Sequence, residues 1–371
     1  MSINFINAMD NMSAQKMTEN GQPALNTTMS KCLDLFAIIG SIRDRDEKDV
    51  YRHLTMAWDE NPELTLKTIF YARDIEAGLG ERKVFRTCLR WLASCHPEVV
   101  IKNFDNIAFF GRYDDFYALE GTPCEDAMFA YLKGVFQKDC QNFKSKQPIS
   151  LLAKWLKSTS GVSIESAKLG KLTAKKLNLS YKEYRKVLSA LRKQLNIVER
   201  NMSMDEWNKI VYSEIPACAM KKYRRAFQKH ELVAFKKYIE KVKNGEEKIN
   251  AKTLYPYNIL EAAGLDDVYY SRSLIMNNWD EVLEEQWKAL PNYVDGKYNI
   301  LVMADTSASM RGTPMATSVG LAMYFAERNQ GPWHNRFLTF ASEPSFVELK
   351  GSNLKKESTH IHICACVYVK V

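Results

Sequence analysis

The sequence lacks any hydrophobic run long enough to cross a membrane. Its most apolar stretch, residues 33–42, is about half of the ~20 residues that a spanning helix needs. The first thirty residues are polar and contain no basic segment followed by an apolar one, so no secretory signal is expected. We therefore expect a cytoplasmic protein that has no membrane partner.

Cysteines at metal-site or redox-site spacing are also lacking. Eight cysteines are scattered along 371 residues without a Cys-x-x-Cys motif, which indicates reduced and mostly buried thiols. Hydrophobic residues make up 46% of the chain and charged residues 26%, which excludes disordered, collagen-like and low-complexity proteins. The length suits two domains or one extended helical array.

Helical periodicity dominates residues 29–290, after a polar segment, 1–28, that we expect to be a flexible tail. Asn61 before Pro62 predicts a helix start, and so does Ser three residues before Glu at 180 and at 203. Apolar spacing of three and four predicts two buried stripes, Leu64, Thr68, Tyr71 and Ile75 in one and Phe85, Leu89 and Leu92 in the other. We expect roughly a dozen helices, and an α-solenoid remains open because stacked helix pairs can diverge beyond recognition.

The pattern changes at 291–297, where Pro, Asn, Asp and Gly cluster and predict a linker. An apolar run at 298–304 predicts a strand that is buried on both faces. A helix that begins at Thr313-Pro314 follows, and further strands are predicted at 336–340 and 345–349. Strand, loop, helix and strand in this order predict a second, α/β domain over residues 298–371.

The net charge of +8 hides a strongly basic middle. Residues 141–245 contain 24 Lys and Arg against 8 Asp and Glu, a balance of +16, so the rest of the chain carries −8. The dense clusters lie at 168–176, 182–193 and 221–229. Such a concentration of positive charge attracts polyphosphate partners. Well-solvated helix faces are the alternative interpretation.

A hydroxyl-rich loop follows the strand predicted at 298–304. It places Asp305, Ser307 and Ser309 at alternate positions before a helix, where α/β domains bind ligands. One carboxylate and two hydroxyls are hard oxygen ligands that suit Mg²⁺, with water or a partner's carboxylate completing the shell. The alternative is that these side chains form local caps.

The sequence contains none of the catalytic motifs that would indicate a hydrolase or nuclease. It contains no Gly-x-Ser-x-Gly elbow, no pair of carboxylates at two-metal spacing and no phosphate-cradling glycine motif. We therefore expect a binding protein and not an enzyme.

Two sets of motifs resemble known families. The Asp-Thr-Ser-Ala-Ser-Met segment at 305–310 resembles the metal-ion-dependent adhesion site of von Willebrand factor A domains. The helical part resembles the TROVE module of telomerase, Ro and vault proteins. It is more closely similar to an uncharacterised family of phages, bacteria and plants that joins a Ro-like helical region to an A-like domain. The segments that carry this resemblance are 67–74, 78–82, 111–116, 184–188 and 219–227.

The Ro-like resemblance implies a mainly α fold in which a ring of HEAT-like helices is closed by the A-like domain. It also implies a ribonucleoprotein component that binds structured or misfolded small RNA. The basic residues that could face RNA are Arg112, Arg185, Lys186, Lys221, Lys222, Arg224 and Arg225. Tyr113 could stack on a base. A helix-capping Gly111 with a buried aromatic residue and an Arg–Asp pair would explain the same segment without RNA.

The A-like part departs from that family. The resemblance implies a domain more than twice as long as residues 297–371, so we expect an incomplete A-like domain without the later loops of the metal site. Near the end, residues 359–367 do not resemble A-domain sequence, which suggests a frameshifted or prematurely ended reading frame. Four residues that can bind metals alternate there: His360, His362, Cys364 and Cys366. In a strand, the first and last of these would lie about 20 Å apart, too far for one Zn²⁺, so no zinc site is expected.

Two functions therefore remain open. The first is RNA binding through phosphate contacts on the basic helical surface. The second is a protein-interaction scaffold, in which Mg²⁺ at the Asp305 loop receives an acidic side chain from a protein partner.

Overall fold

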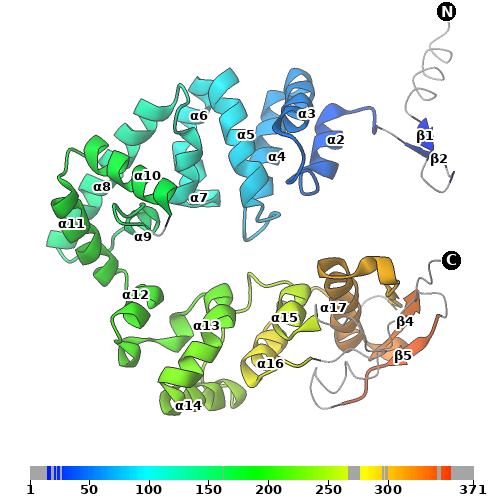
Figure 1. Ribbon diagram of the computed structural model, residues 1–371. Coiled ribbons are helices and arrows are strands. Elements are labelled where there is room, and N and C mark those ends of the chain that lie inside the picture. Colours follow the sequence, from blue (N-terminus) through cyan, green and yellow to red (C-terminus); the bar gives the residue numbers. More distant parts are fainter. Residues whose placement is uncertain are drawn as a thin grey trace, which may run out of the picture. The chain divides into compact units, whose positions relative to one another are not determined.

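Helices form most of the structure. The computed structural model (Figure 1) describes residues 15–17, 21, 23–25, 27–161, 163–265, 276–294, 296, 300–340 and 344–351. The chain divides into two compact units, unit 1 (Met1–Arg200) and unit 2 (Asn201–Val371). The prediction of a mainly α protein is confirmed, because strands occupy only short segments of the described residues. None of the described helices is long and apolar enough to cross a membrane.

The helices of unit 1 pack against their neighbours in chain order. They are α2 (Lys31–Ile38), α3 (Glu47–Glu60), α4 (Pro62–Arg73), α5 (Arg82–Cys95), α6 (Pro97–Lys102), α7 (Phe104–Phe110), the 3₁₀ helix η1 (Tyr113–Leu119), α8 (Glu125–Lys144), α9 (Leu152–Trp155), α10 (Ile164–Lys176) and α11 (Tyr181–Gln194). Contacts join α2 to α3, α3 to α4, α4 to α5 and α5 to α6, and α11 contacts α8, α9 and α10. The next helix, α12 (Val198–Ser203), spans the boundary to unit 2.

The predicted tail lies only partly within the described residues. There the structure shows two short antiparallel strands, β1 (Gln15–Met17) and β2 (Pro23–Leu25), with Lys16 opposite Ala24. The sequence pattern did not indicate this pair, because three-residue strands are too short to show an alternation.

Local sequence signals set two of the helix starts. The Asn61 side chain accepts a hydrogen bond from Leu64 N at 3.0 Å, and a proline occupies the first turn of α4. Ser180 and Glu183 form a reciprocal capping box at the start of α11. The start predicted at Ser203 is wrong, since Ser203 is the last residue of α12.

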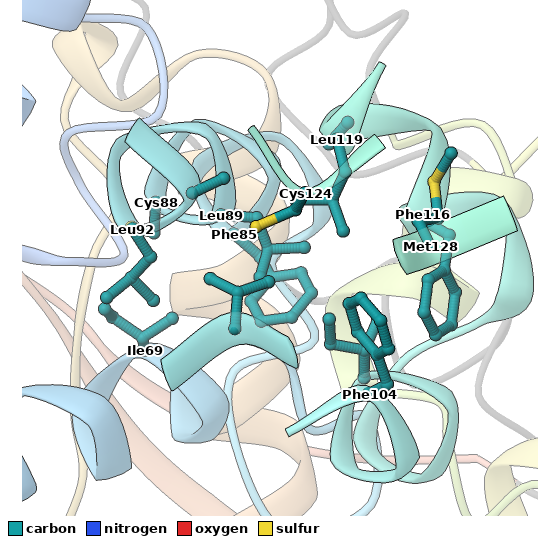
Figure 2. Packing of buried hydrophobic residues seen from close by; sticks show 14 of the residues in the cluster. Ile69, Phe85, Cys88, Leu89, Leu92, Phe104, Phe116, Leu119, Cys124 and Met128 are labelled. Carbon is teal, nitrogen blue, oxygen red and sulfur yellow. The ribbon is translucent and has the colours of Figure 1, made fainter. Parts of the chain in front are cut away.

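The core of unit 1 is one cluster of apolar side chains that extends from α2 to α11. Figure 2 shows part of this cluster, where side chains of α4, α5, α7, η1 and α8 gather. The predicted stripe of Phe85, Leu89 and Leu92 is buried there, as its spacing requires.

The stripe predicted around α4 is wrong for three of its four residues, since only Thr68 is buried. Leu64, Tyr71 and Ile75 are exposed. The face that α4 buries instead is made of Thr65, Thr68, Ile69 and Ala72. Neighbouring helices cover this face, and the hydroxyls of the two threonines are satisfied by carbonyl oxygens one turn earlier in the helix.

Unit 2 combines helices with a small sheet. Its elements are the 3₁₀ helices η2 (Trp207–Lys209) and η3 (Tyr212–Glu214), then α13 (Ala217–His230), α14 (Leu232–Lys243), α15 (Pro256–Ala262), α16 (Glu281–Lys288), β3 (Met303–Asp305), η5 (Ala308–Met310), α17 (Thr313–Arg328), η6 (Gly331–Trp333), β4 (Arg336–Phe340) and β5 (Phe346–Glu348). One apolar cluster contains side chains of α15, α16, α17 and the sheet, so these elements share a core.

The sheet of unit 2 has the strand order β3-β4-β5. β3 and β4 are parallel, with Ala304 opposite Thr339, and α17 connects them and packs on both. β5 is antiparallel to β4. The strand predicted at 336–340 is confirmed. The strand predicted at 298–304 is shorter than expected, because β3 begins at Met303 although residues 300–302 are described. Residues 298 and 299 lie outside the described residues, as do His360, His362, Cys364 and Cys366.

Candidate functional site

A buried carboxylate joins three segments of unit 1. Asp115 is fully buried, and its Oδ2 accepts hydrogen bonds from Arg73 Nε at 2.8 Å and from the backbone N of Arg112 at 3.0 Å. Its Oδ1 accepts from Arg86 Nε at 2.7 Å. Since these donors come from α4, α5 and the start of η1, the carboxylate fixes the three segments against one another.

Asp114 extends this ion-pair network. Its Oδ2 accepts a hydrogen bond from Arg86 Nη2 at 2.8 Å. Burial alone would lower the pKa of Arg86, but the charges of Asp115 and Asp114 outweigh it and raise this pKa above its ordinary value. Within the described residues, Nη2 of Arg73 and Oδ1 of Asp114 are buried without a hydrogen-bond partner. The network thus consists of two arginines, Arg73 and Arg86, that form ion pairs with two aspartates, Asp114 and Asp115.

Gly111 makes room for this network. A Cβ atom at this position would lie 2.7 Å from Asp115 Oδ2 and 2.8 Å from the carbonyl oxygen of Ile107. No side chain fits at such distances without displacing the carboxylate or the end of α7. The contacts of this segment thus favour the structural interpretation of Gly111 and its neighbours.

Arg112 and Tyr113, two of the predicted RNA-binding residues, are half-buried. The Arg112 guanidinium lies 4.6 Å from the centroid of the Trp155 ring, and burial together with the charge of Arg73 lowers its pKa. The Tyr113 ring stacks on Phe116, with centroids 6.1 Å apart. Both side chains thus have a protein partner, which reduces the surface that they offer to a nucleic acid.

Most cations of α10 and α11 are exposed to solvent, unlike the half-buried Arg112. Residues 164–194 contain nine Lys and Arg against two Glu, a net charge of +7. Seven of these cations are exposed and form no ion pair with a described residue: Lys168, Lys171, Lys175, Lys182, Arg185, Lys186 and Lys193. We call this set the α10–α11 basic face. It places the predicted residues Arg185 and Lys186 beside further cations on two helices that contact each other.

Arg224 of α13 has a structural role. Its side chain is 8% exposed, and Nε donates to Asp280 Oδ2 at 2.6 Å. The remaining donors reach the carbonyl oxygens of Lys221, Ala262 and Asn278. Because four of its five N–H donors are used inside unit 2 and the side chain is buried, Arg224 offers little to a phosphate.

The other predicted cations of α13 differ in exposure. Lys221 is half-buried, its Nζ donates to the Asn258 carbonyl oxygen at 3.1 Å, and burial lowers its pKa. Lys222 and Arg225 are exposed, although Arg225 Nη2 donates to Asn278 Oδ1 at 2.6 Å. Thus two of the four predicted residues on this helix present their charge to solvent.

The three predicted metal ligands lie next to one another. β3 ends at Asp305, and the following loop turns back so that Ser307 donates to Asp305 Oδ1 from its backbone N at 3.0 Å and from Oγ at 2.6 Å. Ser309 Oγ lies 3.2 Å from Ser307 Oγ. The hydrogen bonds from Ser307 lower the pKa of Asp305, which keeps the carboxylate charged.

These two separations are hydrogen-bond lengths, and they are also close to the distance between neighbouring ligands of a small divalent cation. Adjacent ligands of an octahedral Mg²⁺ with bonds of 2.0–2.1 Å are about 2.9 Å apart, and the separations of 2.6 and 3.2 Å lie on either side of that value. Within the described residues, no group of three His, Cys, Asp or Glu could hold a metal ion. Water or a partner's carboxylate would therefore have to supply the other ligands.

Sequence reasoning missed a pocket in unit 1 that we call the basic pocket. It has a volume of about 370 Å³ and lies between the α2–α3 connection and the first half of α5. Its cationic lining residues are Arg43, Arg45, Arg82, Lys83, Arg86 and Arg90. The run of cations from 82 to 90 was visible in the sequence, but only the tertiary fold brings residues 43 and 45 to it.

Two family models match different parts of the chain. The chain belongs to the DUF2828 family, described as a domain of unknown function, whose model matches residues 18–119 and 149–297. A second model, DUF7788, also described as a domain of unknown function, matches residues 299–366.

A relative in a giant virus covers nearly the whole chain. The sequence is 28% identical over 388 residues to "Uncharacterized protein L728" of Acanthamoeba polyphaga mimivirus, and the match covers 93% of this chain. The chain spans 65% of the length of that relative. No solved structure matches the chain.

Proposed function

We propose that this protein binds RNA through the α10–α11 basic face. The observation that carries the proposal is the set of seven exposed cations without ion-pair partners among the described residues. Unpaired surface cations repel one another and release counterions when they meet phosphates, so they suit a polyphosphate chain. Within unit 2, Lys222 and Arg225 of α13 are exposed and are further candidate phosphate contacts.

A finer fold assignment belongs to this proposal. Consecutive helices of unit 1 pack on their chain neighbours, as in the HEAT-like solenoids that the Ro resemblance implies. In unit 2, β3, α17 and β4 form a parallel βαβ unit with the Asp305 loop at the carboxyl end of β3, as in von Willebrand factor A domains. The closed ring implied by the resemblance stays a prediction.

The test is RNA binding as a function of salt concentration. We expect a structured small RNA to bind the full chain at low salt, with log K falling linearly as log[KCl] rises. In the double variant Arg185→Gln/Lys186→Gln the slope should decrease by about 1 for each phosphate contact removed. Fluorescence anisotropy with a labelled RNA measures both quantities.

A matched control is the double variant Arg52→Gln/Lys67→Gln, which removes the same charge from exposed residues of unit 1 that already have carboxylate partners. This control should keep the wild-type slope. The proposal is overturned if wild-type protein binds no RNA at low salt, or if both double variants weaken binding equally.

The second candidate is a protein-interaction scaffold that uses Mg²⁺ at the Asp305 loop. The favouring observation is the adjacency of Asp305 Oδ1, Ser307 Oγ and Ser309 Oγ. The cation would expose an open coordination position to an acidic side chain of a protein partner. Calorimetric titration of the full chain with Mg²⁺ tests this, and Asp305→Ala should abolish the binding heat.

A further inference from the structure

The basic pocket has an unusual lining. Six of its eleven lining residues are cations, and Glu47 is the one carboxylate among them. The pocket lies where the connection between α2 and α3 meets the start of α5. A concave site lined by guanidinium groups suits phosphate oxygens, because each guanidinium can donate two parallel hydrogen bonds to them.

The start of α5 adds to this positive field. The N-cap residue Glu81 makes no side-chain hydrogen bond to the helix and pairs with Arg43 at 2.8 Å instead. The first turn has no acid and carries Arg82 and Lys83. Every other described helix of unit 1 with at least six residues has an acid in its first turn. Because cations next to the positive end of a helix cost stability, an anion is the expected complement.

The loop before α5 holds this helix start in place. Leu79 N, Gly80 N and Glu81 N donate to backbone carbonyls of α4 and its end, at 3.0, 2.9 and 2.7 Å. A Cβ atom on Gly78 would lie 2.0 Å from the Tyr71 carbonyl oxygen, so only glycine permits this close return of the chain. The Gly78–Arg82 segment, singled out in the sequence, thus positions one wall of the basic pocket.

The cations that line the pocket are not all paired with carboxylates. Arg73 pairs with Asp115, and Arg86 pairs with both Asp114 and Asp115. Burial, and after it the charges of Arg73 and Arg82, lowers the pKa of Arg112. At the rim, Arg43 pairs with Glu81, Arg45 with Asp49, Lys83 with Asp44, and Arg90 with Glu47. Exposed pairs such as Lys83–Asp44 are weak, so a phosphate can compete with them. Arg82 has no carboxylate partner among the described residues.

We propose that the basic pocket binds a terminal phosphate group of the RNA ligand, with Arg82 and Arg45 as its principal contacts. This inference rests on the proposed function, since the phosphate is taken to belong to RNA. Arg86 lines the pocket and is held by Asp114 and Asp115, which are buried in unit 1, so we assign the pocket to the end of an RNA chain and not to a continuous backbone. The volume of about 370 Å³ is large enough for more than one phosphate group.

The test uses the full chain with two probes. Inorganic tripolyphosphate is titrated calorimetrically at about 50 mM KCl, where screening leaves electrostatic binding strong. RNAs of one sequence with a 5′-triphosphate, a 5′-monophosphate or a 5′-hydroxyl end are compared by anisotropy. We expect Arg45→Gln/Arg82→Gln to weaken tripolyphosphate binding at least about tenfold, and to abolish the preference for phosphorylated ends. The control Lys67→Gln/Lys102→Gln removes the same charge from two exposed residues and should change tripolyphosphate binding less than about twofold, because neither residue lines the pocket or shares a carboxylate with a described residue that does.

The outcomes separate the two proposals. If RNA binds with no dependence on its end and the pocket variant changes nothing, the pocket proposal is wrong and RNA binding by the α10–α11 basic face stands. If tripolyphosphate binds in the pocket but no RNA binds at all, the assignment of the phosphate to RNA is wrong. If tripolyphosphate does not bind wild-type protein, or both double variants lose it equally, the pocket is not an anion site.

Discussion

Arg73 Nε donates a hydrogen bond to Asp115 Oδ2 at 2.8 Å, and both side chains are withdrawn from solvent. The two residues lie 42 positions apart in the sequence, one at the end of α4 and the other in η1. Asp115 also accepts hydrogen bonds from the Arg86 side chain and from the backbone N–H of Arg112. A carboxylate with all of these partners acts as an internal brace between α4, α5 and η1.

Asp115→Ala should be strongly destabilising. The change leaves Arg73 charged and buried without its carboxylate, and removing one partner of a buried pair costs about 3–5 kcal/mol. Hydrogen exchange should show lost protection in α4, α5 and η1, and urea should unfold unit 1 at lower concentration. The exposed pair of Glu63 and Lys67 offers a control, since Glu63→Gln should change the free energy of unfolding by less than about 0.5 kcal/mol. Equal effects of the two substitutions would contradict the brace.

Gly111→Ala should destabilise unit 1 by about 1–3 kcal/mol, because the new methyl group would overlap Asp115 Oδ2 and the Ile107 carbonyl. Gly134→Ala in α8 is the matched control. Nothing lies within 4 Å of a Cβ there, so alanine should stabilise the helix by about 0.5–1 kcal/mol. Urea denaturation of both variants measures the difference, and a destabilising Gly134→Ala together with a neutral Gly111→Ala would refute the packing argument.

Arg224 and Arg225 should respond in opposite ways. Arg224→Gln removes a buried ion pair with Asp280 and contacts to carbonyl oxygens, which should cost about 2–4 kcal/mol and expose α13 and α16 to hydrogen exchange. Arg225→Gln should leave stability within about 0.5 kcal/mol and weaken only RNA binding. An unfolded Arg225→Gln protein, or an Arg224→Gln protein as stable as the wild type, would contradict this assignment.

Ser307→Ala should raise the pKa of Asp305. In the folded protein the hydroxyl and backbone N–H of Ser307 hold this pKa below its ordinary value of about 3.9. A depressed carboxyl pKa contributes stability above the unfolded pKa, and this contribution is lost as the pH falls through the folded pKa. Carboxyl ¹³C NMR titration measures the pKa of Asp305. This pKa should change less in Ser309→Ala than in Ser307→Ala, because the Ser309 hydroxyl contacts Ser307 and not the carboxylate. An unchanged pKa in Ser307→Ala would rule out the hydrogen bond as its cause.

Features that depend on nearby residues were predictable from the sequence. The caps at Asn61 and Ser180, the stripe on α5 and the strand at 336–340 each arise from interactions within a few residues or from a regular period. The loop of Asp305, Ser307 and Ser309 is equally local, and its hydrogen bonds from Ser307 to Asp305 are those that the alternative of local caps predicts.

Features that depend on distant partners were not predictable. Arg224 and Arg225 are adjacent in the sequence, and only Asp280, 56 residues later, decides that the first is buried. The buried face of α4 is selected by its neighbouring helices and not by the most apolar spacing. The basic pocket joins residues about forty positions apart, so no window of the sequence contains it.

The start of α5 also has a consequence for how the purified protein behaves. The helix α5 begins with cations and has no side-chain cap. The repulsion between these cations and the positive end of the helix dipole lowers its stability. If phosphate binds there, occupancy and folding are linked, and the melting temperature of unit 1 becomes a property of the buffer as well as of the chain. The protein in phosphate buffer would then have a higher melting temperature than the same protein in an uncharged buffer, before any nucleic acid is added.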